Sequence, residues 1–563
     1  MEGNIRTAIT TALTNLGISS VDFSIEHPGD LSHGDYATNV AMAAAKQAGS
    51  NPRALAEQIV SELRSQNIPY VATIDPAGPG FINFTLTREF FTEQMQHALS
   101  LKDAWGKSDA LAGKKVMVEY TSPNLFKPLH IGNLMSNIVG ESLARLFEYS
   151  GADVKRFNYP SDIGLTVAKG VWALKKNGGN PDDIDALGAA YREGNAAYED
   201  DTNAKIEIES VNKILYLGED EELNNLRARG IATSLAHLRT LCEVLGTSFD
   251  FEYFESESGS KGRALVLAHI EDGIFEESEG AVVFKGERFD LHTRVFINSA
   301  GLPTYEAKDL GLAAIKMEAY PFDLSVTTTA VEQDAYFKVI IRAIEEVFPK
   351  LRGKVVHVGY GFLTLTTGKM SSRKGNVITG ESLITDMREK ALKKIADRVL
   401  EGGDTEKSAI VDMIAVSAIK YMALRQSTSR NIVFDPEKSL SFEGDSGPYL
   451  QYTYARINSI LEKAHREGVV SSTVNATNQI VEVEKILYRF PSVVLRAQKE
   501  YEPHYVATYL SELAGVFNTW YANEKIVDAG DEYSPYKVAL ASAVAQTIKN
   551  GLWVLGIKAP ERM

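Results

Sequence analysis

The sequence predicts a multidomain protein that joins an α/β core to an all-α C-terminal part. A chain of 563 residues is too long for one hydrophobic core and should divide into about three or four domains. A short apolar run at 115–120 is typical of a buried parallel strand, and it leads through a loop into a helical pattern from about Ile131 to Tyr149. From about residue 405 the apolar residues follow a helical spacing almost to the end of the chain.

Residues 1–105 are expected to form a small α+β domain. Apolar residues at helical spacing predict helices around 9–16 and 54–63. Strand-like runs follow at 68–74 and 81–84.

Residues 106–404 are expected to form the α/β domain, with an insertion at about 170–290. The first part of this insertion is rich in charge and largely helical in pattern. Strand-like runs lie at 281–284, 294–297, 324–327 and 354–358. Residues 405–563 are expected to form a helical bundle. Its helices are predicted around 410–422, 448–463, 485–498, 503–524 and 535–555.

Charge and composition narrow the classes of function. A net charge of −15 argues against a general nucleic-acid coat, but a large RNA-binding enzyme needs only a local basic surface. Cys242 is the only cysteine and the histidines lack metal-ligand spacing, so neither a disulfide nor a structural metal is expected. The chain has no apolar run of about 18 residues, and its N-terminus lacks a basic region leading into an apolar one. A cytoplasmic protein without a membrane span is therefore expected.

The segment from Lys127 to Asn133 lies where the first strand turns into a helix. A helix start offers unpaired N–H groups and a positive dipole, which suit a phosphate. His130 and Asn133 add side-chain donors, Gly132 lets a nucleotide approach the backbone, and Lys127 supplies a cation. Taken alone the pattern is weak, because these are also ordinary residues at a helix start.

A second segment, about 240 residues later, is strongly basic. It holds the cations Lys369, Arg373 and Lys374 and the hydroxyls of Ser371 and Ser372, with glycines at both ends. Such a loop can close on a phosphoryl transition state and stabilise its charge. The alternative is an exposed basic loop. Two such segments in this order, each after a buried strand, predict ATP held between two halves of an α/β domain.

These two segments resemble the HIGH and KMSKS signatures of class I aminoacyl-tRNA synthetases, and their extended forms resemble the arginyl-tRNA synthetase family. The similarity covers nearly the whole chain. The segments that carry it are Glu119 to His130, Met370 to Val377, His33 to Asn39, Gly78 to Asn83, Asn158 to Gly164, Gly301 to Leu310, Phe442 to Ile457 and Leu555 to Met563. Two positions depart from the pattern: Asn133 stands where the family usually has His, and Ser372 where KMSKS has its second Lys.

The resemblance implies a Rossmann-like catalytic domain with an insertion, an N-terminal accessory tRNA-binding domain and a helical anticodon-binding domain. It implies an arginine–tRNA ligase that forms arginyl-adenylate from L-arginine and ATP with Mg²⁺, then transfers arginine to tRNA(Arg). Activation is expected to need bound tRNA, and a monomer is expected. The residues expected to act in catalysis are Lys127, His130, Asn133, Lys369, Arg373 and Lys374. Those expected to bind ATP are His130, Gly132, Asn133, Met370, Ser371 and Ser372.

An arginine substrate presents a planar fork of N–H donors, so its pocket should contain carboxylates. Tyr305 and Asp309 are four residues apart and can share one helix face. By resemblance, the arginine-binding residues are Glu119, Asn124, Tyr305, Asp309, Gln333 and Glu255, and Glu257 competes with Glu255. The alternative for each acid is an ordinary surface charge.

In the C-terminal bundle, the expected tRNA contacts are Tyr449, Tyr452, Arg456 and Trp520, unless their rings belong to the core. Two other interpretations stay open. One keeps the fold with glutaminyl or cysteinyl specificity, against which Tyr305, Asp309 and the single cysteine argue. The other is a non-catalytic tRNA-binding paralogue, which the departures at Asn133 and Ser372 suggest.

Overall fold

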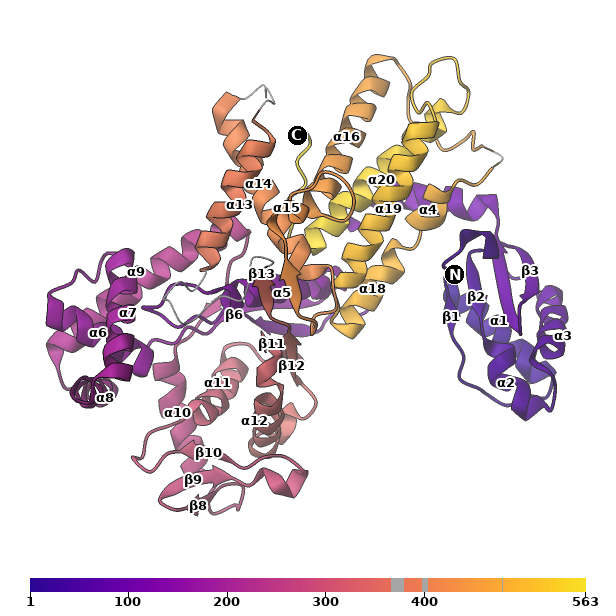
Figure 1. Cartoon of the computed structure of the whole chain (residues 1–563). Helices are drawn as coiled ribbons and strands as arrows, with labels where there is room; N and C mark the ends of the chain where they lie inside the picture. Colours follow the sequence, from indigo (N-terminus) through magenta and orange to yellow (C-terminus); the bar gives the residue numbers. More distant parts are fainter. Residues whose placement is uncertain (366–378, 397–402, 478) are drawn as a thin grey trace. The chain divides into compact units, whose positions relative to one another are not determined.

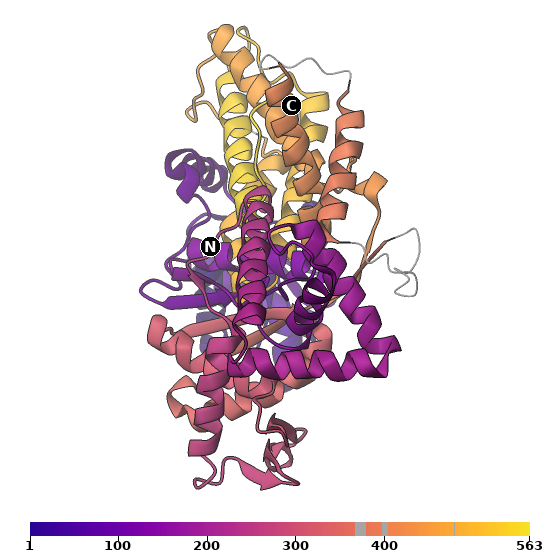
Figure 2. The ribbon, with the colours of Figure 1, turned by 90° about the vertical axis from the view of Figure 1, so that its left-hand side faces the viewer.

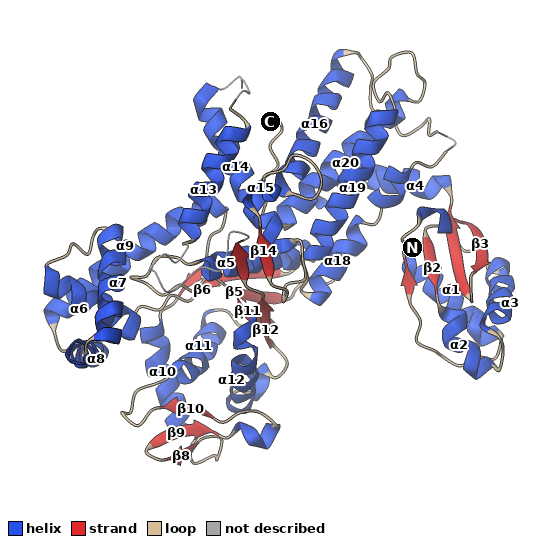
Figure 3. Ribbon diagram, viewed as in Figure 1, coloured by secondary structure: helices blue, strands red, loops and turns tan. Residues whose placement is uncertain are grey.

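The computed structural model describes residues 1–365, 379–396, 403–477 and 479–563. These residues form two compact units. The smaller unit consists of Met1–Trp105, Arg456–Pro491 and Glu512–Ile548, and the larger one of Gly106–Ala455, Ser492–Ser511 and Lys549–Met563. Helices outnumber strands in both (Figure 3). The bounds of the three domains expected from the sequence stay a prediction.

A five-stranded parallel sheet lies at the centre of the larger unit, in the order β12-β11-β5-β6-β7. Its strands are β5 (Lys115–Glu119), β6 (Asp153–Asn158), β7 (Phe251–Glu252), β11 (Leu324–Ala330) and β12 (Val355–Tyr360). The chain runs from β5 to β6 and β7 on one side and adds β11 and β12 on the other. Ligands of open α/β sheets bind beyond the carboxyl ends of the strands at such a switch point. The predicted fold class is confirmed.

Helices cover both faces of this sheet (Figure 1). The alternation of side chains along a strand explains how β5 contacts both. Glu119 points to one face, where it pairs with Lys316, and Tyr120 to the other, where its hydroxyl donates to Glu141. The helices concerned are α5 (Ile131–Tyr149), which packs on β5, β6 and β11, and, on the opposite face, α11 (Tyr305–Ala319) and α12 (Asp334–Val347). The helix predicted after the first motif is α5.

Along the chain, β6 and β7 are separated by a group of helices with its own hydrophobic core. Figures 1 and 2 show them side by side. They are α6 (Leu165–Asn177), α7 (Ile184–Asp200), α8 (Thr202–Leu217) and α9 (Glu221–Leu245). After β7 follow α10 (Glu255–Ala268), β8 (Glu276–Ser278), β9 (Ala281–Phe284) and β10 (Arg294–Ile297). The predicted strands at 281–284 and 294–297 thus exist, but they pair antiparallel in a separate sheet.

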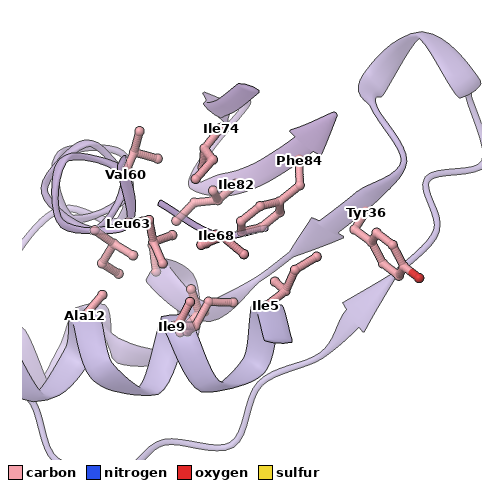
Figure 4. Packing of buried hydrophobic residues seen from close by; sticks show 14 of the residues in the cluster. Ile5, Ile9, Ala12, Tyr36, Val60, Leu63, Ile68, Ile74, Ile82 and Phe84 are labelled. Atoms are coloured by element: carbon pink, nitrogen blue, oxygen red, sulfur yellow. The ribbon is translucent and has the colours of Figure 1, made fainter. Parts of the chain in front are cut away.

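The first hundred residues form an antiparallel sheet, in the order β1-β2-β4-β3, covered by helices. The elements are α1 (Glu2–Asn15), β1 (Ile25–Glu26), β2 (Tyr36–Thr38), α2 (Val40–Ala48), α3 (Pro52–Ser65), β3 (Val71–Ala77), β4 (Phe81–Leu86) and α4 (Arg88–Leu101). Ile9 of α1 and Phe84 of β4 point into their common core (Figure 4). The strand predicted from Ile68 begins three residues later, because Tyr70 has a φ of 64° and cannot continue an extended strand.

The remaining chain is mostly helical. Its elements are β13 (Leu363–Leu365), α13 (Gly380–Lys394), α14 (Gly403–Leu424), β14 (Ile432–Phe434), α15 (Pro436–Ser439), α16 (Gly447–Arg466), α17 (Glu482–Leu487), α18 (Phe490–Glu500), α19 (His504–Asn523) and α20 (Ser534–Val554). The single helix predicted over 485–498 is two helices, because Pro491 fits only the first turn of α18. Among the described helices, none is long and apolar enough to cross a membrane.

Candidate active site

A cavity of about 710 Å³ opens beyond the carboxyl ends of β5, β11 and β12. We call it the main cavity. The loop after β5, the first turn of α5 and the ends of β11 and β12 supply most of its wall. The residues predicted for the site that line it are Asn124, Lys127, His130, Gly132, Asn133 and Gln333.

His130 caps the N-terminus of α5. Its Nδ1 accepts from the backbone N–H of Asn133 at 3.3 Å, so the neutral ring carries its proton on Nε2. Burial, with Lys127 nearby, lowers the pKa of His130 to about 4. His130 therefore offers a neutral N–H donor at physiological pH, not a charge.

Asn133 and Gly132 support the loop around His130. The Asn133 side-chain amide donates to the Thr121 carbonyl at 3.0 Å, which ties α5 to the end of β5. A methyl group on Gly132 would lie 2.8 Å from Cε1 of His130, so glycine leaves room for the imidazole. The Gly132 carbonyl accepts from the Tyr360 hydroxyl at 2.9 Å. These contacts add a reason for Gly132 beyond the predicted approach of a nucleotide.

The loop between β5 and α5 has an unusual backbone. Thr121, Ser122 and Phe126 have φ values of 73°, 38° and 65°, a region that costs side-chain-bearing residues about 1–3 kcal/mol each. Hydrogen bonds hold the loop there. The Thr121 N–H donates to Ser136 Oγ at 2.9 Å, and the Leu125 N–H donates to the carbonyl of Ser161, after β6, at 3.1 Å. The cavity wall is therefore preorganised by α5 and by the segment that follows β6.

Lys127 lies between the main cavity and the helices of the insertion. Burial and the like charge of Lys169 lower its pKa. Its Nζ lies 5.8 Å from the ring centre of Tyr191, and the neighbouring Arg192 also lines the cavity. The sequence offered no signal for Tyr191 or Arg192, because a Tyr-Arg pair in a charged helix is ordinary.

The second motif, Gly368 to Gly375, falls within residues 366–378 and therefore lies outside the described residues. Its predicted members are Lys369, Met370, Ser371, Ser372, Arg373 and Lys374. The flanking residues Leu363 and Thr379 both line the main cavity. Thr379 also caps α13, and the next N–H donates to the Leu129 carbonyl at 2.7 Å. The chain therefore returns from the second motif directly beside the first.

The six residues predicted for arginine do not line one pocket. Asn124 and Gln333 line the main cavity, whereas Glu119 and Asp309 line a cavity of about 30 Å³ beneath the sheet. Glu119 forms an ion pair with Lys316 and accepts from the Thr327 hydroxyl at 3.1 Å. The sequence did not indicate Lys316, which lies far from Glu119 along the chain.

Glu119, Asp309 and Glu255 lie close enough together for their charges to interact, and we call these three residues the acidic group. Asp309 accepts from the Tyr336 hydroxyl at 2.6 Å, and burial, reinforced by Glu119 and Glu255, raises its pKa to about 7. Glu255 is buried in an ion pair with Lys308 at 2.6 Å. The competing Glu257 is exposed, so burial favours Glu255.

Tyr305 begins α11 one turn before Asp309 and is 63% exposed. Its ring centre lies 5.0 Å from the Nζ of Lys308. A planar cation could therefore reach this ring from solvent. In the part of the chain that the structure describes, no three His, Cys, Asp or Glu side chains gather as a metal-binding group.

Three family models match successive parts of the chain. Residues 94–436 match the catalytic domain of tRNA synthetases class I (R), residues 3–86 the arginyl tRNA synthetase N terminal domain, and residues 450–563 the DALR anticodon binding domain. The first match alone covers more than half of the chain. The chain belongs to the class I arginyl-tRNA synthetase family. The resemblance inferred from the two motifs is confirmed.

Similar proteins match over nearly their full lengths. An arginine–tRNA ligase of Treponema denticola is 30% identical over 548 residues, which span 94% of this chain and 93% of that protein. Two solved structures share the fold. Thermus thermophilus arginyl-tRNA synthetase has a TM-score of 0.79 at 24% identity and covers 99% of both chains. The Plasmodium falciparum arginyl-tRNA synthetase has a TM-score of 0.82 at 22% identity, covering 100% of this chain and 99% of that one.

The predicted tRNA-contacting residues of this arginyl-tRNA synthetase family member are all partly exposed: Tyr449, Tyr452, Arg456 and Trp520. Arg456 donates to the Asn518 side chain at 2.8 Å. Trp520 packs edge-on against Phe517, with ring centres 5.8 Å apart, and lines a cavity of about 190 Å³. The rings of Tyr449, Tyr452 and Trp520 are therefore partly packed in the core and partly accessible to solvent.

Proposed function

We propose that this chain is an arginine–tRNA ligase. It activates L-arginine with ATP, which yields arginyl-adenylate and pyrophosphate, and transfers arginine to the 3′ end of tRNA(Arg). The observation that carries the proposal is the main cavity at the carboxyl edge of the sheet, where a helix N-terminus, His130 and Lys127 converge. Family membership supports the same activity.

ATP would bind with its phosphates at the start of α5. The positive end of the helix dipole, the neutral His130 donor and the Lys127 ammonium all favour an anion. The substrate carboxylate attacks the α-phosphorus and pyrophosphate leaves, so the protein need supply only position and charge stabilisation. Lys369, Arg373 and Lys374 would stabilise the transition state, and Mg²⁺ would enter as part of the ATP substrate.

Arginine would be selected by the acidic group below the cavity. Asp309 accepts from a neutral tyrosine, whereas Glu119 and Glu255 are already paired with lysines. A guanidinium at Asp309 would keep this carboxylate ionised and satisfy it with directional N–H donors. A neutral analogue would leave the carboxylate unpaired, which costs several kcal/mol. Asn124, Gln333 and Tyr305 complete the proposed arginine contacts.

The C-terminal helices would hold the anticodon, with Tyr449, Tyr452, Arg456 and Trp520 as contacts. We also propose that arginine activation requires bound tRNA, and that the enzyme is a cytoplasmic monomer. The match to an anticodon-binding domain model supports the tRNA partner.

ATP–pyrophosphate exchange, measured with each amino acid and total tRNA, tests the proposal. We expect arginine to be the only amino acid that supports exchange, and we expect this exchange only when tRNA is present. Exchange with glutamine or cysteine instead would overturn the specificity, and no exchange with any amino acid would favour the non-catalytic interpretation. Arginine exchange without tRNA would refute the tRNA requirement only.

A further inference from the structure

Phe126 occupies a slot that two glycines of the insertion create. Its side chain is 1% exposed and belongs to the core of α6–α9. A methyl group on Gly170 of α6 would lie 2.8 Å from Cδ1 of the Phe126 ring. A methyl group on Gly230 of α9 would lie 2.3 Å from Cζ and 2.6 Å from Cε1. Only glycine at both positions leaves room for the ring. We call this arrangement the glycine slot.

The backbone supports the same conclusion. Glycine inside a helix costs about 0.5–1 kcal/mol relative to alanine, and both glycines lie within helices. Neither has a positive φ, so backbone conformation gives no reason for them. Phe126 itself has a φ of 65°, and its N–H donates to Ser234 Oγ of α9 at 3.2 Å. The insertion therefore holds both the ring and the backbone of Phe126.

Lys127 follows directly and lines the main cavity. The same helices surround it. Tyr191 of α7 lies beneath its ammonium, and Lys169 of α6, next to Gly170, is the like charge that acts on it. Pro128 lies 3.5 Å from the position that a Cβ of Gly188 would take. The insertion thus contacts three successive residues at the phosphate end of the cavity.

We infer that Phe126 is a positioning residue, through which the helical insertion sets the place of the Lys127 ammonium in the main cavity. The shape of the glycine slot then determines how well the cavity binds the phosphates of ATP. The inference rests on the proposed function, because it takes Lys127 to be a phosphate ligand. It assigns a role in nucleotide binding to an aromatic residue that does not line the main cavity.

Calorimetric titration with ATP and, separately, with arginine tests the slot on the full chain. We expect Gly230→Ala to weaken ATP binding by about 10- to 100-fold, since a misplacement of about 1 Å has effects of this size, and to leave arginine binding within about twofold. In a Phe126→Ala background the same substitution should have no further effect, because the ring it displaces is gone. Gly515→Ala is the matched control, since a methyl group there meets nothing within 4 Å.

A second cycle separates positioning from mere packing. Phe126→Ala should weaken ATP binding in the wild-type background but not in a Lys127→Met background, because it acts through Lys127. Additive losses there, or equal losses for ATP and arginine, would overturn the inference. If Gly230→Ala fails to fold, Phe126→Ala and Phe126→Leu carry the same comparison. Calorimetry measures binding without turnover. A wild-type protein that transfers no arginine would refute the proposed function, whereas the ATP affinities of the variants would still test the slot.

Discussion

Asp309 is the proposed arginine-binding residue whose carboxyl group has a pKa close to neutral pH. Burial first, then the Glu119 and Glu255 charges, raises its pKa from 3.8 to about 7, so the carboxyl group is largely neutral at pH 6. A guanidinium binds the ionised form, and binding therefore releases a proton below the pKa. We predict that the KM for arginine falls about tenfold from pH 6 to pH 8 and levels off above pH 8, measured by aminoacylation.

Asp309→Asn is the control for this prediction. The amide cannot ionise, so arginine should bind more weakly and the KM for arginine should lose its dependence on pH. The KM for ATP should not follow the arginine curve in either protein. A wild-type KM for arginine that stays constant between pH 6 and pH 8 would contradict the role of Asp309.

The sequence predicted which residues lie at the cavity better than it predicted the contacts that they make. His130 and Asn133 stand in a contiguous motif, and the structure brings both to the main cavity. Glu119 could be predicted by resemblance, but its ion pair with Lys316 could not, because the two lie on different elements far apart along the chain. The second motif falls outside the described residues, so its roles stay predictions.

Among the elements, α14 is buried along its second half, with every residue from Ile414 to Leu424 buried. Lys420 sits within this stretch and donates at 2.6 Å to the carbonyls of Leu245 and Gly556, near the ends of α9 and α20. An ammonium at helix C-termini satisfies carbonyls that have no partner in the helix. Lys420 therefore links α14 to the last residue of α9 and to the segment that follows α20.

We predict that Lys420→Met lowers the free energy of unfolding by about 1–3 kcal/mol, because it leaves two carbonyls without this donor. Urea unfolding followed by circular dichroism measures the change. Lys407→Met, on the same helix, removes only an exposed hydrogen bond to the Ala396 carbonyl and should change stability by less than about 0.5 kcal/mol. Equal effects of the two substitutions would contradict the role of Lys420.

The sequence predicted elements where the pattern is local. The bounds of α5 follow from its apolar spacing and Gly151, whereas the sheet that contains β9 and β10 depends on pairing partners that a strand pattern does not specify. The apolar spacing predicted a helix around 410–422, but it did not indicate that residues 414–424 of α14 are buried on every side. The glycine slot could not be predicted from the sequence, because it depends on the contact of Phe126 with Gly170 and Gly230, which lie far from it along the chain.

For the whole molecule, the smaller unit depends on a buried charge that connects distant parts of the chain. Arg88 of α4 forms an ion pair with Glu484 of α17, which is 2% exposed, and donates to the Tyr536 hydroxyl at 3.0 Å. Removing one partner of a buried pair leaves an uncompensated charge. This pair therefore holds residues of the N-terminal hundred to helices of the C-terminal part within one compact unit.

We predict that Arg88→Met destabilises the protein by about 3–5 kcal/mol, and that the double variant Arg88→Met, Glu484→Gln is more stable than Arg88→Met alone. The Tyr536 hydroxyl also donates to Glu484, so the glutamine removes the stranded charge and can still accept from Tyr536. Thermal unfolding of the single and double variants makes the comparison. If the double variant were no more stable than Arg88→Met, the unpaired charge of Glu484 would not be the cause of the destabilisation.

The general organisation could be predicted from length, pattern and motifs, since an α/β core, an N-terminal α+β part and a C-terminal helical part are all present. Long-range contacts such as Arg88 with Glu484 could not, because no local pattern encodes them. The domain boundaries remain a prediction, since the two compact units are each made of segments from distant parts of the chain.

Transfer of labelled arginine to total tRNA, with ATP and Mg²⁺, tests the central claim most directly. The account predicts arginine bound to tRNA in an amount limited by tRNA(Arg), abolished when ATP is omitted and strongly reduced by Lys127→Met. Labelled glutamine and cysteine should not be transferred. A wild-type protein that leaves arginine unattached, or that attaches one of the other two amino acids, would contradict the account.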